Sequence, residues 1–115
     1  MIWNCGTGTK LTEVDTGNQV SGIHWNHHFK ELITGHGYPN NLLKIWKYPK
    51  FNLIADLEGH DARIISTSMS PCTQMVASLG ADETLRIWKC FDNQNDKAKT
   101  KSTAPAASKI VTTLR

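Results

Sequence analysis

The segments VSGIHWNHHFKELITGHGYPNNLLKIW (residues 20–46) and IISTSMSPCTQMVASLGADETLRIW (residues 64–88) align along their length. The first is longer by two residues, which are placed most simply within 38–41. Both segments end in Ile-Trp, and a third Ile-Trp pair stands near the start of the chain. The tryptophans at these positions, Trp3, Trp46 and Trp88, are 43 and 42 residues apart. Self-similarity at a fixed period of this length is typical of proteins built by repeating one small unit.

Short apolar segments bounded by glycine, proline and asparagine turns indicate β-strands in both repeats. The predicted strands cover residues 20–25, 31–34, 42–48, 52–57, 64–69, 75–79 and 84–90. Four strands in roughly 40–45 residues is the period of a propeller blade. The sequence therefore predicts an all-β fold, a partial WD-repeat β-propeller of about two and a half blades.

The domain organisation follows from this period. Residues 1–19 are expected to end a preceding blade, 20–58 to form a WD blade, and 59–91 to form the last WD blade. Residues 92–115 are expected to be a flexible, disordered basic tail, so that nothing supplies the outer strand of the last blade. Because repeat units need neighbours and open blades expose strand edges, we expect the isolated chain to be marginally stable.

The last repeat contains the side chains of a WD-type hydrogen-bond network, namely His60, Ser78, Asp82 and Trp88. In that pattern the histidine is hydrogen-bonded to the turn aspartate, and the serine and tryptophan complete the series of hydrogen bonds. A buried histidine and a buried carboxylate need such partners, so we interpret this set as structural rather than catalytic. In the preceding repeat the set is incomplete, because Asp15-Thr16-Gly17 replaces Gly-His and Asn41 stands near the turn position.

Composition narrows the class of protein. The chain of 115 residues is 39% hydrophobic and 20% charged, which is ordinary for a globular protein. Its net charge of +3 lies in residues 92–115, because the first 91 residues hold eight basic and eight acidic groups. A basic tail could touch nucleic acid, but no aromatic residue lies among its lysines to stack on bases. We therefore favour a solvated linker and no nucleic-acid partner.

Targeting and redox features are few. No apolar run approaches the roughly 20 residues that cross a membrane, and the first residues form no signal peptide. Three cysteines without close spacing, Cys5, Cys72 and Cys90, favour free thiols. We expect no membrane association and a location in the nucleus and cytoplasm.

Catalytic and cofactor sites find little support. The four histidines of residues 24–36 lack a cysteine or carboxylate at zinc-ligand spacing, and residues 6–10, GTGTK, lack the spacing of a phosphate-binding loop. No nucleophile–histidine–acid arrangement is evident. The prediction is a binding protein, not an enzyme, with no metal and no cofactor.

The strings KELITGHGYPNNLLKIWKYPKF (30–51), LEGHDARIISTSMSP (57–71) and ADETLRIWKCF (81–91) resemble the last blades of the Fizzy family. This family comprises the WD-repeat coactivators of the anaphase-promoting complex, a ubiquitin ligase. The likeness covers nearly all of residues 1–91, and Gly35-His36-Gly37 is not found between the second and third strands of generic WD repeats.

The resemblance implies a substrate-recognition and activator subunit, whose partners are ligase subunits and degron-bearing protein substrates. Gln19 and Arg63 match family positions that contact the KEN box, and Glu83 matches a position that meets the destruction-box arginine. The terminal pair Leu114-Arg115 resembles the Ile-Arg tail that docks on tetratricopeptide subunits of the ligase. The alternatives are a generic WD interaction scaffold and a non-functional truncated paralogue.

Overall fold

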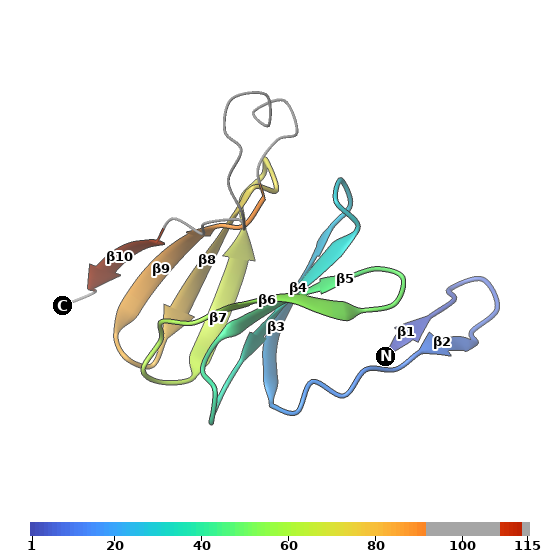
Figure 1. The fold of residues 1–115 in the computed structure, drawn as a ribbon, viewed down its shortest axis with the longest axis horizontal. Coiled ribbons are helices and arrows are strands. Elements are labelled where there is room, and N and C mark those ends of the chain that lie inside the picture. The colour runs from blue at the N-terminus through green and yellow to red at the C-terminus, as the bar shows by residue number, and fades with distance from the viewer. Residues whose placement is uncertain (92–108, 114–115) are drawn as a thin grey trace.

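The computed structural model describes residues 1–91 and the backbone of residues 109–113. Within these ranges all regular structure is β-strand, arranged in three antiparallel sheets (Figure 1). None of the described residues forms a helix of the length and apolarity that crossing a membrane requires.

The sheets are two blades and an N-terminal hairpin. The hairpin pairs β1 (Ile2–Trp3) with β2 (Lys10–Thr12). The middle blade has the order β3-β4-β5-β6 and the last blade the order β10-β9-β8-β7. The middle blade consists of β3 (Val20–Asn26), β4 (Glu31–His36), β5 (Leu43–Lys47) and β6 (Asn52–Leu57). The last blade consists of β7 (Ile64–Met69), β8 (Met75–Gly80), β9 (Thr84–Lys89) and β10 (Lys109–Thr113).

Local chemistry closes the hairpins within each blade. The Asn26 side chain accepts hydrogen bonds from the backbone N–H groups of His28 and Phe29, which shapes the turn between β3 and β4. At the β8–β9 turn, Glu83 adopts a left-handed conformation with φ of 62°, and its N–H donates to the carbonyl of Gly80. These tight turns make consecutive strands neighbours and fix the antiparallel order.

The two blades pack face to face through a shared apolar core. Its buried side chains come from β4, β5 and β6 of the middle blade and from β7, β8, β9 and the segment after β9, and include Ile33, Leu43, Ile45, Leu57, Ile64, Val76, Trp88, Cys90 and Phe91. The innermost strands β3 and β7 approach closely, because a Cβ on Gly22 would overlap the Thr67 hydroxyl. His24 Nε2 lies 2.9 Å from the same hydroxyl. This close contact fixes the spacing of the blades at their inner edge.

One expectation about the last blade is wrong. A fourth strand is present, because β10 pairs antiparallel with β9 over five consecutive residue pairs, from Lys109↔Trp88 to Thr113↔Thr84. The reason is that β9 offers an open strand edge, and four residues of the KIVTT segment are β-branched, a composition that favours strands. The rest of the predicted flexible tail, residues 92–108 and 114–115, lies outside the described residues.

Candidate functional site

The candidate site lies along one edge of the two blades, where the chain enters the first strand of each blade. Gln19 precedes β3 and Arg63 precedes β7, so the two residues hold equivalent positions. The Gln19 carbonyl accepts a hydrogen bond from Gly37 N–H at 3.1 Å, and the Arg63 carbonyl accepts one from Ala81 N–H at 2.9 Å. Each residue is thus tied by its backbone to the turn that follows the second strand of its own blade.

Gly37 brings Gln19 and Arg63 together. A Cβ built on Gly37 would lie 3.5 Å from Gln19 Oε1 and 3.6 Å from Arg63 Cβ. Gly37 itself is buried, whereas Gln19 and Arg63 are both exposed. An amide and a guanidinium therefore face solvent on either side of a residue that has no side chain.

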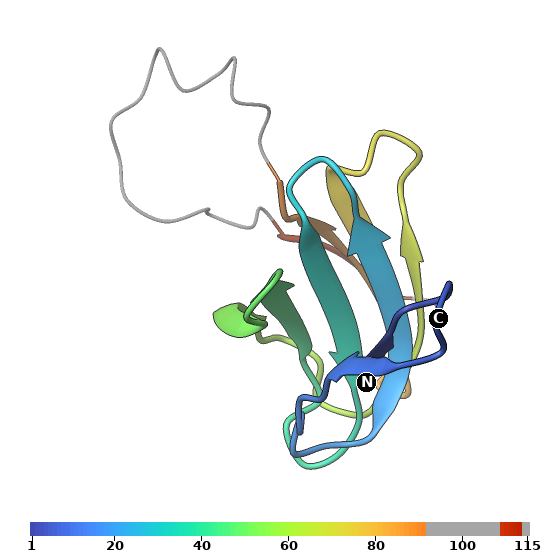
Figure 2. The same ribbon diagram turned by 90° about the vertical axis from the view of Figure 1, so that its right-hand side faces the viewer.

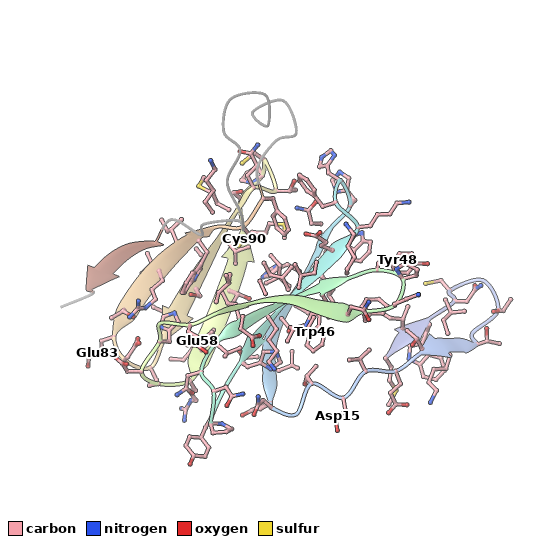
Figure 3. The ribbon with its side chains drawn as sticks, viewed as in Figure 1. Asp15, Trp46, Tyr48, Glu58, Glu83 and Cys90 are labelled. Atoms are coloured by element: carbon pink, nitrogen blue, oxygen red, sulfur yellow. The ribbon has the colours of Figure 1, made fainter. Side chains whose placement is uncertain are left out.

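Glu83 lies on the same edge, at the far side of Arg63. The bond from Ala81 to Arg63 places the β8–β9 turn beside Arg63, and Glu83 is exposed at the tip of this turn. Figure 3 shows Glu83 at the end of the last blade. We call Gln19, Gly37, Arg63, Ala81 and Glu83 the rim. The backbone bond between Ala81 and Arg63 links the Glu83 end of the rim to the Gln19 end.

Behind the rim, one hydrogen-bonded network fixes the β8–β9 turn. Trp88 Nε1 donates to Ser78 Oγ at 2.8 Å, Ser78 Oγ lies 2.7 Å from His60 Nε2, and His60 Nδ1 lies 3.0 Å from Asp82 Oδ2. Asp82 also accepts bonds from the Thr84 hydroxyl and the Asp61 N–H, at 2.7 and 2.9 Å. The four side chains singled out in the sequence therefore lie in contact, and the turn carrying Glu83 is held by its neighbour Asp82.

The protonation of Asp82 reflects this network. Burial raises the pKa of this carboxyl, but hydrogen bonds from the Thr84 side chain, the Asp61 backbone and the His60 side chain together outweigh burial. The pKa of Asp82 is therefore well below its usual range. A carboxylate that stays ionised and fully bonded is suited to holding a turn and not to proton transfer.

The middle blade contains an equivalent network that the sequence did not reveal. Trp46 Nε1 donates to Thr34 Oγ1 at 2.8 Å, and Thr34 Oγ1 lies 2.7 Å from His36 Nε2. The sequence interpretation looked for the histidine at Asp15-Thr16-Gly17, where the repeat period puts it, and found none. The signal was the hydroxyl of Thr34, which aligns with Ser78, followed two residues later by a histidine on the same face of the strand.

His36 is fully buried, and its Nδ1 has no hydrogen-bond partner among the described residues. Burial lowers the pKa of His36, and Lys44 lowers it further. The carbonyl groups of Gln19 and Asn18 act in the opposite direction, without reaching hydrogen-bond geometry with Nδ1. The ring is therefore held neutral, directly beneath the rim.

A hollow lies on the face of the middle blade that is turned away from the last blade, against the N-terminal hairpin, which stands in front of this blade in Figure 2. It has a volume of about 190 Å³ and is lined mainly by apolar side chains, including Met1, Ile2, Val14, Leu32, Trp46 and Phe51. Trp46 is labelled in Figure 3. Such a lining is typical of stacking between repeat units, because it offers few polar groups that would orient a ligand.

The histidines of residues 24–36 do not form a common site. His24 bonds to Thr67, His36 belongs to the Thr34 network, and the rings of His27 and His28 are tilted against each other with centroids 4.0 Å apart. Among the described residues, no three His, Cys, Asp or Glu side chains are placed to hold a metal ion. The predicted docking residues Leu114 and Arg115 lie outside the described residues.

Comparison with known proteins agrees with this architecture. Residues 51–89 match the family described as WD domain, G-beta repeat. A chain from a solved structure, titled the crystal structure of a mitotic checkpoint complex, superposes with a TM-score of 0.75 and 35% identity. That likeness covers 78% of this chain and 29% of the other.

Two relatives are similar in sequence. The "Anaphase-promoting complex subunit cdc20" of Dictyostelium discoideum is 45% identical over 94 residues, covering 82% of this chain and 19% of the relative. The "B-type cell cycle switch protein ccs52B" of Medicago truncatula is 40% identical over 102 residues, covering 89% of this chain and 21% of the relative. The chain thus spans about a fifth of the length of these relatives. With the WD network and the blade architecture, these likenesses show that the chain belongs to the Fizzy family of WD-repeat proteins.

Proposed function

We propose that this chain contributes the degron-recognition surface of an activator subunit of the anaphase-promoting complex. The names of the relatives support the association with that ligase, and the rim supports the recognition role. The chain acts as an adaptor that binds substrate, while ubiquitin transfer belongs to the ligase and its conjugating partner.

The pairing of Gln19 and Arg63 across Gly37 is the observation that carries this proposal. The amide of Gln19 can both donate to and accept from peptide backbone, and the guanidinium of Arg63 can bind a carboxylate through two parallel hydrogen bonds. Because Gly37 has no side chain, the exposed Gln19 and Arg63 side chains lie on either side of it, where one short peptide can contact both. A short segment with a carboxylate beside polar backbone, such as the KEN box, has the complementary groups.

Glu83 supplies the opposite charge at the other end of the row. An exposed carboxylate on a fixed turn is complementary to an arginine, as in the destruction box, and charge-assisted pairs of this kind are the strong ones. The rim thus offers a cationic group for an acidic residue and an anionic group for a basic residue. Two degron types would then use different stretches of one edge.

Titration of a fluorescent KEN-box peptide into the 115-residue chain tests the proposal. Arg63→Ala and Gln19→Ala are each expected to weaken binding by about tenfold or more, which corresponds to about 1.4 kcal/mol. Lys50→Ala is the matched control. Lys50 is exposed in the turn between β5 and β6, and its substitution removes one positive charge, as Arg63→Ala does. If all three variants bind the peptide like the unaltered chain, the degron assignment fails and a generic WD scaffold is favoured.

The tail gives the second part of the proposal. Leu114-Arg115 keeps an apolar residue followed by arginine, the combination expected for docking on the ligase. Deleting these two residues should reduce co-purification of ligase subunits with the chain. Undiminished co-purification would remove the docking role and leave the rim assignment unaffected.

A further inference from the structure

His36 fills, from a different strand, the place that His60 fills in the last blade. The position of β8 that aligns with His36 is Gly80, and a Cβ there would collide with the ring of His60. Both rings present Nε2 to a hydroxyl at 2.7 Å, that of Thr34 in one blade and that of Ser78 in the other. The two imidazoles therefore hold equivalent positions, although one comes from β4 and the other from the loop before β7.

The second ring nitrogen distinguishes the two histidines. In the last blade, Nδ1 of His60 lies 3.0 Å from the Asp82 carboxylate. Nδ1 of His36, in contrast, is buried and has no hydrogen-bond partner among the described residues. The backbone groups that act on this ring are the carbonyls of Asn18 and Gln19. Nδ1 of His36 is thus turned toward the segment that carries Gln19 to the rim.

Backbone pairing holds this segment beside the ring. Val20, which follows Gln19, stands opposite His36 in the β3–β4 register, and the Gly37 N–H donates to the Gln19 carbonyl at 3.1 Å. The side chain of Gln19 is exposed at the same point of the chain. A change in how the ring of His36 supports this carbonyl would therefore move the Gln19 side chain.

The directions of the hydrogen bonds determine which nitrogen of His36 carries the proton. The hydroxyl of Thr34 accepts the indole N–H of Trp46, so its own proton can be donated. In the part of the chain that the structure describes, the acceptor in contact with this hydroxyl is Nε2 of His36. A neutral imidazole that accepts at Nε2 carries its proton on Nδ1. A buried N–H requires an acceptor, and the carbonyls of Asn18 and Gln19 are the acceptors at hand.

We propose that His36 is a positioning residue of the rim, whose Nδ1–H supports the carbonyls of Asn18 and Gln19 and so sets the direction of the Gln19 side chain. Trp46, Thr34 and His36 then form one series of donors that ends at this segment. The effect on degron binding rests on the proposed function. The protonation of Nδ1 and the support of the segment do not.

The position of the proton can be measured in the unaltered 115-residue chain. Long-range nitrogen–proton correlation spectra distinguish an imidazole protonated on Nδ1 from one protonated on Nε2. The signals of His36 are identified by their loss in His36→Gln. We expect Nδ1 to carry the proton near neutral pH. A proton on Nε2 would overturn the proposal, because Nδ1 would then have nothing to donate.

Two substitutions separate the two ring nitrogens. The amide nitrogen of asparagine is bonded to Cγ, as Nδ1 is in histidine, whereas that of glutamine lies one bond further out, as Nε2 does. His36→Asn therefore keeps a donor beside the Gln19 carbonyl, and His36→Gln keeps a partner for Thr34. We expect His36→Gln to speed amide hydrogen exchange of Gly37 by about tenfold or more relative to Ile33, and His36→Asn to change it little.

His60→Gln is the matched control for this measurement. It alters the equivalent network of the last blade, where Nδ1 lies beside Asp82. The exchange of Gly37 relative to Ile33 should therefore stay unchanged in this variant. Equal relative exchange in His36→Asn and His36→Gln would overturn the proposal.

Affinity for a KEN-box peptide, measured per folded molecule in the same variants, connects the segment to recognition. His36→Gln should bind about tenfold more weakly than the unaltered chain, and His36→Asn about as tightly as it. Equal affinities in the two variants, where Arg63→Ala still weakens binding, would overturn the positioning role. An unaltered chain that fails to bind the peptide would instead overturn the proposed function, and the Nδ1 proton and Gly37 exchange would still decide the role of His36.

Discussion

Thr34 and Ser78 make equivalent hydrogen bonds in the two blades. Each hydroxyl accepts the indole N–H of its blade's tryptophan at 2.8 Å and lies 2.7 Å from the Nε2 of a histidine. The histidines, however, come from different places. His60 precedes the first strand of its blade, whereas His36 ends the second strand of its own. The network is thus defined by the position of the hydroxyl and tryptophan more than by the origin of the histidine.

Removing the shared hydroxyl should destabilise the last blade. Ser78→Ala leaves Trp88 Nε1 and His60 Nε2 buried without their partner, and each unpaired buried group costs about 1–3 kcal/mol. We expect a loss of about 2–6 kcal/mol in the free energy of unfolding, measured by urea titration of tryptophan fluorescence. Thr34→Ser, which keeps the hydroxyl in the middle blade, should cost far less. Equal effects of the two substitutions would contradict this account.

Stability should fall with acid below about pH 6.5, the ordinary pKa of histidine. The pKa of His36 is lowered in the fold, so the unfolded chain takes up its proton first, and protonation favours unfolding. His36→Gln should therefore flatten the dependence of the unfolding free energy on pH between about 7 and 5. A slope that is the same in the unaltered chain and in His36→Gln would show that His36 does not titrate in this way.

Gly37→Ala should separate binding from folding. The added Cβ would sit 3.5 Å from Gln19 Oε1 and 3.6 Å from Arg63 Cβ, which is ordinary contact, so the melting temperature should barely change. The methyl group nevertheless lies against both Gln19 and Arg63 and changes how these two side chains are presented to a peptide. Affinity for a KEN-box peptide should drop several-fold, as measured by fluorescence anisotropy. A large fall in the melting temperature, or full affinity with unchanged stability, would contradict this role for Gly37.

Arg86 should be replaceable at no cost in stability. Its side chain is buried, and Nε and Nη1 have no hydrogen-bond partner among the described residues. A buried charge without such partners opposes folding, so Arg86→Met should leave the free energy of unfolding unchanged or raise it by about 1–3 kcal/mol. The exposed Arg63→Met is the matched control and should have no effect. A clear loss of stability in Arg86→Met alone would reveal a partner for the guanidinium.

The sequence predicted the features that depend on local pattern. All seven strands expected between residues 20 and 90 are present, because alternating apolar residues and turn residues determine them locally. The equivalence of Gln19 and Arg63 followed from the repeat alone. Two features escaped prediction. The role of His36 depends on which face of β4 it occupies, and β10 pairs with a strand 20 residues earlier through backbone groups that leave little trace in the sequence.

The contact between Gly22 and Thr67 has a consequence for larger assemblies of such blades. Gly35 contributes to the same recess, since a Cβ there would lie 3.0 Å from the Thr67 methyl carbon. Two glycines of the middle blade thus receive one threonine of the last blade, and a methyl group on either would act as a wedge at the seam. In a closed ring of four to eight blades, the angles between neighbours must add to a full turn. A methyl group at this seam would change the angle between these two blades, and the angles at all the other seams would have to change to compensate. The absence of side chains at Gly22 and Gly35 therefore sets the curvature of the ring.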